Sequence, residues 1–114
     1  MNSKTDFLSY ILDDAMNGIP GITARAMFGG YGLYKDGVIF GIIADDELYF
    51  KTGDSNQKDY TSAGSRPFTY EGKKGKKIAL SYWEVPSDVL ENREEIEVWI
   101  NKAVKVSLKA KKGK

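Results

Sequence analysis

The chain has 114 residues, 41% of them hydrophobic and 12% aromatic, and a formal net charge of +1. These values fit a single globular domain and exclude intrinsic disorder, which combines low hydrophobicity with a large net charge. Cysteine and histidine are both absent. Their absence excludes disulfides, thiolate nucleophiles, histidine-based triads and the commonest zinc sites, so we expect no cofactor, no metal site and no catalytic residues.

The longest apolar run, residues 38–44, is far shorter than the roughly 20 residues that span a bilayer. The N-terminal residues lead into an amphipathic segment without the apolar core of a signal peptide. We therefore expect a cytoplasmic protein that contacts no membrane.

Apolar residues between Phe7 and Met16 recur at the spacing of one helical face, and they predict a first helix over residues 6–16. Thr5 or Asp6 is the expected N-cap, and Asn17-Gly18 is the expected end.

Four short segments rich in aromatic and β-branched residues follow, and they predict strands over residues 23–28, 31–35, 38–44 and 48–51. Asp36-Gly37 predicts a hairpin turn, because glycine readily adopts the positive φ that such a turn requires. The acidic residues 45–47 are expected to form the next hairpin turn. Ile39, Gly41 and Ile43 are expected to line one face of the sheet.

In the second half of the chain, residues 54–63 predict a short helix capped by Asp54 or Ser55. Strands are predicted over residues 68–71 and 78–84. Residues 86–88 open a helical turn, and Asn92 with Glu95 resembles the capping box of a final helix.

This order of elements predicts an α+β, two-layer domain over residues 1–108. Helices should pack on a curved, mostly antiparallel β-sheet in the order α-βββ(β)-α-ββ-α. Residues 109–114 are predicted to form a basic C-terminal tail that frays.

Two motifs have both a chemical and a structural interpretation. Gly29, Gly30 and Gly32 could cradle a phosphate, but that motif requires a helix directly after it, and a strand is predicted here, which favours a bulge or close backbone approach. The acids at 45–47 could supply paired carboxylates or bind a hard metal ion, but their position favours a solvated turn.

Arg25 lies in a predicted strand between two alanines, where its guanidinium needs a partner or must reach solvent. It either pairs with a carboxylate of the sheet or a helix, or projects from the outer sheet face as an interaction residue.

The charge is asymmetric, since residues 1–72 carry a net −4 and residues 73–114 a net +5. Much of the positive charge lies in two lysine clusters: Lys73, Lys74, Lys76 and Lys77 in a loop, and Lys109, Lys111 and Lys112 near the C-terminus. These clusters are candidates for nucleic-acid binding. The alternative interpretation is a solvated loop and tail.

The segment Arg-Ala-Met-Phe-Gly-Gly-Tyr-Gly-Leu-Tyr at residues 25–34, followed by Tyr-Trp-Glu-Val-Pro at 82–86, resembles the N-terminal domain of the TfoX (Sxy) competence regulators. The resemblance covers roughly residues 5–105. It implies a two-layer domain with helices against a curved antiparallel sheet, and it supplies no catalytic residues. Longer members promote transcription of competence genes, apparently with a cyclic-AMP receptor protein, and carry a second helical domain that this sequence does not contain.

Three hypotheses of function follow. The first is a non-enzymatic regulatory or protein-interaction module, with a partner in the transcription machinery, in which the outer sheet face and the residues Arg25, Phe28, Tyr31 and Tyr34 contact the partner. An edge strand could also pair two copies into a homodimer. The second hypothesis is direct nucleic-acid binding through the lysine clusters. An enzymatic role would require an apolar cleft that holds Lys51 or Asp54 beside a second ionisable group.

Overall fold

The computed structural model describes residues 3–27, 30–71 and 77–112. Its elements in chain order are α1 (Ser3–Ser9), the π-helical segment η1 (Tyr10–Ala15), β1 (Ile22–Met27), β2 (Gly30–Lys35), β3 (Val38–Ala44), β4 (Glu47–Lys51), α2 (Gln57–Ser62), β5 (Pro67–Glu71), β6 (Lys77–Glu84), α3 (Ser87–Leu90) and α4 (Arg93–Lys112). Among the described residues no helix has both the length and the apolar character needed to cross a bilayer.

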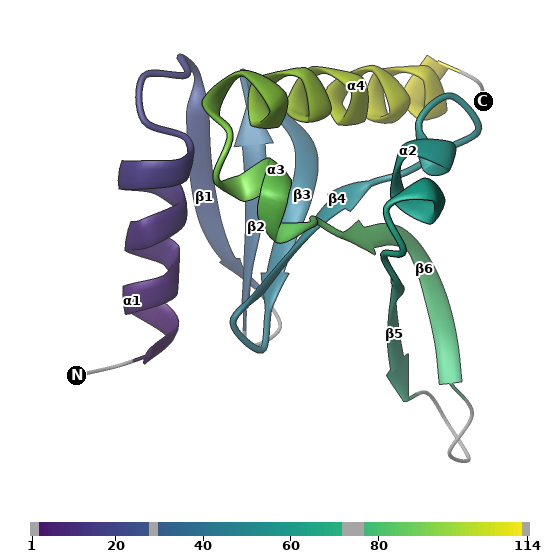
Figure 1. Cartoon of the computed structure of the whole chain (residues 1–114), viewed down its shortest axis with the longest axis horizontal. Coiled ribbons are helices and arrows are strands. Elements are labelled where there is room, and N and C mark those ends of the chain that lie inside the picture. Colours follow the sequence, from purple (N-terminus) through teal and green to yellow (C-terminus); the bar gives the residue numbers. More distant parts are fainter. Residues whose placement is uncertain (1–2, 28–29, 72–76, 113–114) are drawn as a thin grey trace.

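The six strands form one antiparallel sheet in the order β1-β2-β3-β4-β6-β5. Figure 1 shows α3 in front of the strands, α4 across their upper ends and α1 beside β1. The predicted α+β fold with helices on an antiparallel sheet is therefore confirmed.

The core lies between the sheet and the helices. Its central residues come from both layers, since Phe40 of β3 and Phe50 of β4 are fully buried, and so are Ile96 and Ile100 of α4. The rings of Phe40 and Phe50 meet edge to face with centroids 5.5 Å apart. Spacing of four residues places both isoleucines on one face of α4, which explains why this helix docks there.

Both predicted hairpin turns are present. Asp36 and Gly37 have φ values of 51° and 83°, and Asp45 and Asp46 have φ values of 51° and 59°. Two successive residues with positive φ are typical of the type I′ turn that joins twisted antiparallel strands. Aspartate tolerates this conformation better than most residues that have a side chain.

Helix boundaries differ from the sequence prediction at two places. The first helix begins at Ser3, so Thr5 and Asp6 lie inside it and neither is its N-cap. Its second half is a π-helix, in which the Met16 amide donates to the Ile11 carbonyl five residues back at 2.9 Å. This wider turn lets Ile11, Ala15 and Met16 all enter the core.

The second helix begins at Gln57, so Asp54 and Ser55 precede it and the predicted cap is wrong. The side chain of Asn56 instead bonds to two backbone groups before the helix, the amide of Gly53 and the carbonyl of Lys51. The N-cap of α4 is as predicted, because Asn92 Oδ1 accepts from the amides of Glu94 and Glu95, each at 3.1 Å.

Gly41 and Ile43 line one face of the sheet as expected, but Ile39 does not join them because β3 contains a bulge. Leu33 is opposite Gly41 and Tyr34 is opposite Ile39, so Phe40 has no partner on β2. The extra residue turns Phe40 into the core and leaves Ile39 half-buried.

Candidate interaction surface

Strand register fixes which side chains point away from the helices. Leu33, Gly41 and Phe50 are cross-strand partners, and Leu33 and Phe50 are fully buried, so this row faces the core. Ile42 and Tyr49 are partners in the adjacent row and therefore project from the opposite side of the sheet.

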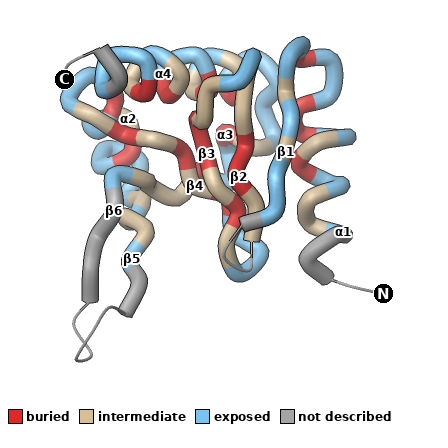
Figure 2. Tube along the Cα trace, turned by 180° about the vertical axis from the view of Figure 1, so that it is seen from behind, coloured by how far each residue is buried: buried red, intermediate tan, exposed pale blue. Residues whose placement is uncertain are grey.

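We call that opposite side the outer face. Register places the following side chains on it: Arg25, Tyr34, Ile39, Ile42, Tyr49, Lys51, Tyr82 and Glu84. All are half-buried except Arg25, which is exposed. Figure 2 views the molecule from this side and shows no helix in front of β1, β2 and β3.

The outer face carries several aromatic contacts. Tyr49 packs edge to face on Phe68 of β5 with centroids 4.9 Å apart. The Lys51 ammonium lies 5.1 Å from the centre of the Tyr82 ring, which is within cation–π distance. Burial first, and the nearby Tyr34 second, raise the pKa of Tyr82. Tyr34 and Tyr82 therefore lie on one continuous surface although they belong to different parts of the chain.

The outer face meets the last turns of α4 at the bulge in β3. Ser107 Oγ donates to the Ile39 carbonyl at 2.6 Å, and Ser107 is buried. Beside this contact is a pocket of about 590 Å³ lined by Tyr34, Gly37, Val38, Ile39, Lys51, Ser107 and Ala110. Its walls are mainly apolar, and Lys51 supplies a cation.

The candidate contact residues of the first hypothesis do not share one face. Arg25 and Tyr34 project from the outer face. Tyr31 is opposite Ile43 in the row that faces the helices and packs against the core. Phe28 lies outside the described residues.

Arg25 has no carboxylate within 4.0 Å among the residues that the structure describes. The pairing interpretation of Arg25 therefore has no partner within that part of the chain. Its exposed guanidinium at the β1 edge of the outer face is free to contact another molecule.

The lysine clusters are only partly within the described residues. Lys73, Lys74 and Lys76 lie outside them, and Lys77 opens β6. Where a frayed tail was predicted from residue 109, α4 continues through Lys112, so Lys109, Lys111 and Lys112 are helical. Earlier in α4, Lys102 forms an ion pair with Asp59 at 2.9 Å.

The other end of the outer face is acidic. Tyr49 Oη donates to Glu47 Oε2 at 3.2 Å, and burial followed by the charge of Glu47 raises the pKa of Tyr49 to about 12. A hydrogen bond to Glu47 raises the pKa of Glu84, burial and the Glu47 charge add to this effect, and Arg66 opposes it. The proximity of Glu47 therefore favours the protonated form of Glu84.

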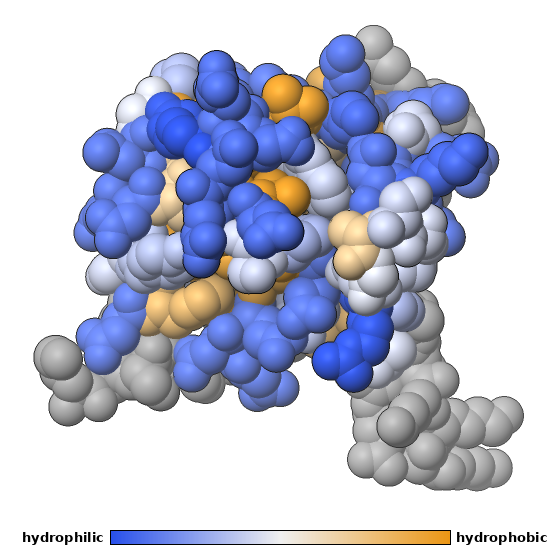
Figure 3. Space-filling model, viewed as in Figure 1, coloured by the Kyte–Doolittle hydropathy of each residue, from blue (hydrophilic) through white to orange (hydrophobic). Residues whose placement is uncertain are grey.

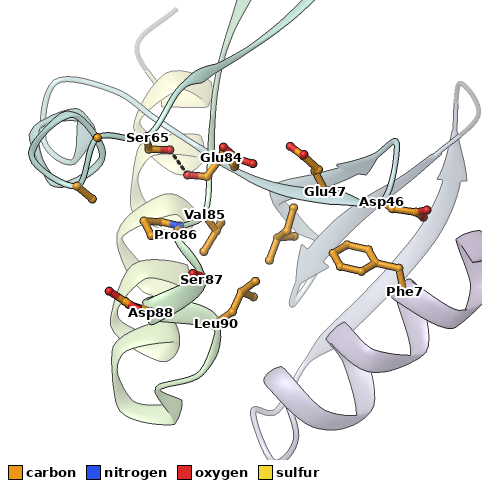
Figure 4. A pocket seen from close by; sticks show the side chains of 13 residues that line it. Phe7, Asp46, Glu47, Ser65, Glu84, Val85, Pro86, Ser87, Asp88 and Leu90 are labelled. Atoms are coloured by element: carbon orange, nitrogen blue, oxygen red, sulfur yellow. Dashed lines mark hydrogen bonds between the residues drawn. The ribbon is translucent and has the colours of Figure 1, made fainter.

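Glu47 and Glu84 are also among the residues that line a pocket of about 480 Å³ on the helix side. Figure 4 shows Phe7 of α1 and Leu90 of α3 on either side of it, with Glu47 and Glu84 along its rim. Ser65 Oγ donates to the Glu84 carbonyl and fixes the chain there. Figure 3 shows that this side of the molecule is mainly hydrophilic, with separate small apolar areas.

The raised pKa of Glu84 leads to a prediction of how stability depends on pH. Because folding raises the pKa of Glu84 above its ordinary value of 4.5, the folded state binds this proton more tightly than the unfolded chain does. The contribution of Glu84 to stability is therefore present below pH 4.5 and is lost as the pH rises through the raised pKa. Glu84→Gln should remove this loss, and its melting temperature should exceed that of the wild type above that range. Melting curves between pH 4 and 7 test this, with Asp46→Asn as the control in the neighbouring exposed turn; parallel wild-type and Glu84→Gln curves would refute it.

The acids of the 45–47 turn are solvated, since Asp45, Asp46 and Glu47 are all exposed. Within the described ranges no group of three or more aspartates or glutamates could hold a metal ion.

The glycine-rich segment has a structural role where it is described. A Cβ on Gly30 would clash with the Ile43 carbonyl oxygen, so this glycine permits a close approach of β2 to β3.

Tyr49, Tyr82 and Ile42 were not among the sequence-predicted site residues. Their period-2 alternation was visible in the sequence, but it does not tell which of the two faces a helix covers. Tyr31 and Tyr34, by contrast, lie three positions apart in one strand, and this odd spacing alone places them on opposite faces.

Comparison with known proteins adds one finding. The family model described as the TfoX N-terminal domain matches residues 14–107, which include the whole sheet and most of α4. No curated protein matches the chain.

Proposed function

The chain belongs to the TfoX N-terminal domain family, and from this premise we propose that it is a regulatory module that acts by binding a protein partner. The family suggests a role related to competence, and the partner we propose is part of the cytoplasmic transcription machinery. The outer face is the contact surface, with Arg25 at its β1 edge and Tyr34 on β2 as the principal contact residues.

One observation carries this proposal. The outer face is a broad sheet surface that presents aromatic and aliphatic side chains, and no helix covers β1 to β3 on that side (Figure 2). Aromatic residues and arginine are the types most often found at the centres of protein interfaces. When a partner excludes water from a half-buried aromatic surface of this kind, the free energy of the system falls, which favours binding.

We propose binding rather than catalysis. The pocket that holds Lys51 beside the ionisable Tyr34 is the kind of cleft that an enzymatic role would require. Among the described residues, however, its lining supplies no carboxylate that could act as a general base at neutral pH, and the sequence contains no histidine or cysteine. The one hydroxyl of α4 in the lining, on Ser107, donates its proton to the Ile39 carbonyl.

The test is binding to purified RNA polymerase, measured by biolayer interferometry. Arg25→Ala and Tyr34→Ala should each raise the Kd about tenfold or more, as for residues at the centre of an interface. Arg93→Ala and Tyr10→Ala are matched controls, because each removes the same side-chain type from an exposed position on a helix. They should leave the Kd unchanged.

Absence of wild-type binding would refute RNA polymerase as the partner, and equal binding by all four variants would refute the outer face as the contact surface. Light scattering on the same preparation tests a further part of the proposal, a homodimer. β1 and β5 are the two edges of the sheet, and such edges can pair with a second copy. A mass of one copy would exclude it.

Direct nucleic-acid binding is the second candidate. The observation in its favour is that Lys105 and Lys109 are exposed and one turn apart on α4, which continues as a helix beyond them. A labelled DNA duplex titrated in place of the polymerase distinguishes the two candidates. Affinity that falls steeply with salt would favour nucleic acid as the target.

A further inference from the structure

The pocket at the junction of the outer face and α4 has the composition of a small-molecule site. Val38, Ile39 and Ala110 provide apolar walls. Gly37 adds no side chain that would close the space. A volume of about 590 Å³ falls within the range of about 300–1,000 Å³ typical of small-ligand pockets.

The polar groups of this pocket select the charge of a ligand. Among the described residues no carboxylate lies within 4.0 Å of the Lys51 ammonium, which is held only against the face of the Tyr82 ring. Ser107 Oγ already donates to the Ile39 carbonyl. The pocket therefore combines an apolar wall with one unneutralised cation, and an anion on an apolar body complements both.

A hydrogen bond to its backbone holds the main chain of Lys51 in place. Its carbonyl accepts from Asn56 Nδ2 at 3.0 Å, and Asn56 is buried. Cation–π contact with Tyr82 restricts the side chain further. A preorganised cation loses little conformational entropy when it binds an anion, which favours affinity.

We propose that this pocket binds a small amphipathic carboxylate. The apolar body lies against Val38, Ile39 and Ala110, and the carboxylate contacts the Lys51 ammonium. This inference goes beyond the proposed function because its ligand is a small molecule and its test requires no protein partner.

The probe for the test is sodium decanoate, kept below the concentration at which it forms micelles. Titration is followed by ¹H–¹⁵N correlation spectra of the full chain. Decanoate should shift the amide signals of Val38, Ile39, Lys51 and Ala110 with a saturable dependence on concentration. Decyltrimethylammonium has an alkyl chain of similar length with a positive charge, and it should bind about tenfold more weakly or not at all, because it lacks the charge-assisted contact.

Three variants identify the parts of the site. Lys51→Met keeps a long side chain without its charge and should weaken decanoate binding about tenfold. Lys51→Glu should reverse the preference towards decyltrimethylammonium. Ala110→Trp should fill the pocket and weaken binding of both probes, whereas Lys105→Met, at an exposed position of α4, should change neither.

Comparison of each variant's spectrum with that of the wild type also shows whether the variant is folded. Decanoate shifts elsewhere in the chain, equal affinity for the two probes, or unchanged affinity in Lys51→Met would each overturn the proposal. Retained polymerase binding with no decanoate binding would overturn this inference and leave the proposed function standing.

Discussion

Ile100→Ala is expected to lower the free energy of unfolding by about 2–5 kcal/mol, the range measured for large-to-small substitutions at fully buried aliphatic positions. Ile100 is 0% exposed and lies on the face of α4 that contacts β3 and β4. The substitution removes three carbon atoms from a position that is fully buried. Neighbouring side chains cannot collapse fully into the space, because Phe40 and Phe50 are already packed against each other.

Val98→Ala is the matched control. Val98 lies on the same helix two residues earlier, is also β-branched, and is 49% exposed. Its truncation should change stability by no more than about 0.5 kcal/mol, because the site loses little buried area and alanine has the higher helix propensity. Urea denaturation of both variants is the measurement, and a loss below 1 kcal/mol for Ile100→Ala would contradict the docking of α4 on the sheet.

The strands and turns were predictable because their signals are local. Asp36-Gly37 lies between two apolar runs, and both residues adopt the positive φ that their types favour. The cap at Asn92 is equally local, since its acceptor and the donor amides lie within three residues. The prediction of β3 as residues 38–44 matches the structure at both ends.

The bulge in β3 was not predictable, because its cause lies elsewhere in the chain. The sequence around Ile39, Phe40 and Gly41 predicts a regular alternating strand. The structure instead pairs the Ile39 carbonyl with Ser107, which is 68 positions away. The bulge frees that carbonyl from the sheet, and α4 supplies its donor. A pattern of neighbouring residues in the sequence cannot predict such a long-range contact.

The candidate site depends on long-range pairing in the same way. Strand β6 pairs with β4, and Lys51 is thereby opposite Tyr82. Both residues were visible in the sequence as a lysine and a tyrosine in strand-like segments, but the order β4-β6-β5 could not be deduced from segment lengths. Their cation–π contact follows only from that order.

Asn56→Ala is expected to lower the free energy of unfolding by about 2–3 kcal/mol, because it leaves two backbone groups without a partner. Asn56 is 1% exposed. Its Oδ1 accepts from the Gly53 amide at 2.8 Å, and its Nδ2 donates to the Lys51 carbonyl at 3.0 Å. One side chain thus joins the end of β4 to the loop that precedes α2.

Asn56→Asp separates the two bonds. It keeps the acceptor for Gly53 but places a carboxylate oxygen against the Lys51 carbonyl, where two acceptors repel each other. We expect this variant to be destabilised as well, and to protect the Gly53 amide from hydrogen exchange better than Asn56→Ala does. Asn101→Ala, at an exposed position of α4, should change stability by less than about 0.5 kcal/mol. Denaturation and amide exchange measure both effects, and a loss below 0.5 kcal/mol for Asn56→Ala would show that water replaces the amide and that the end of β4 is held by other contacts.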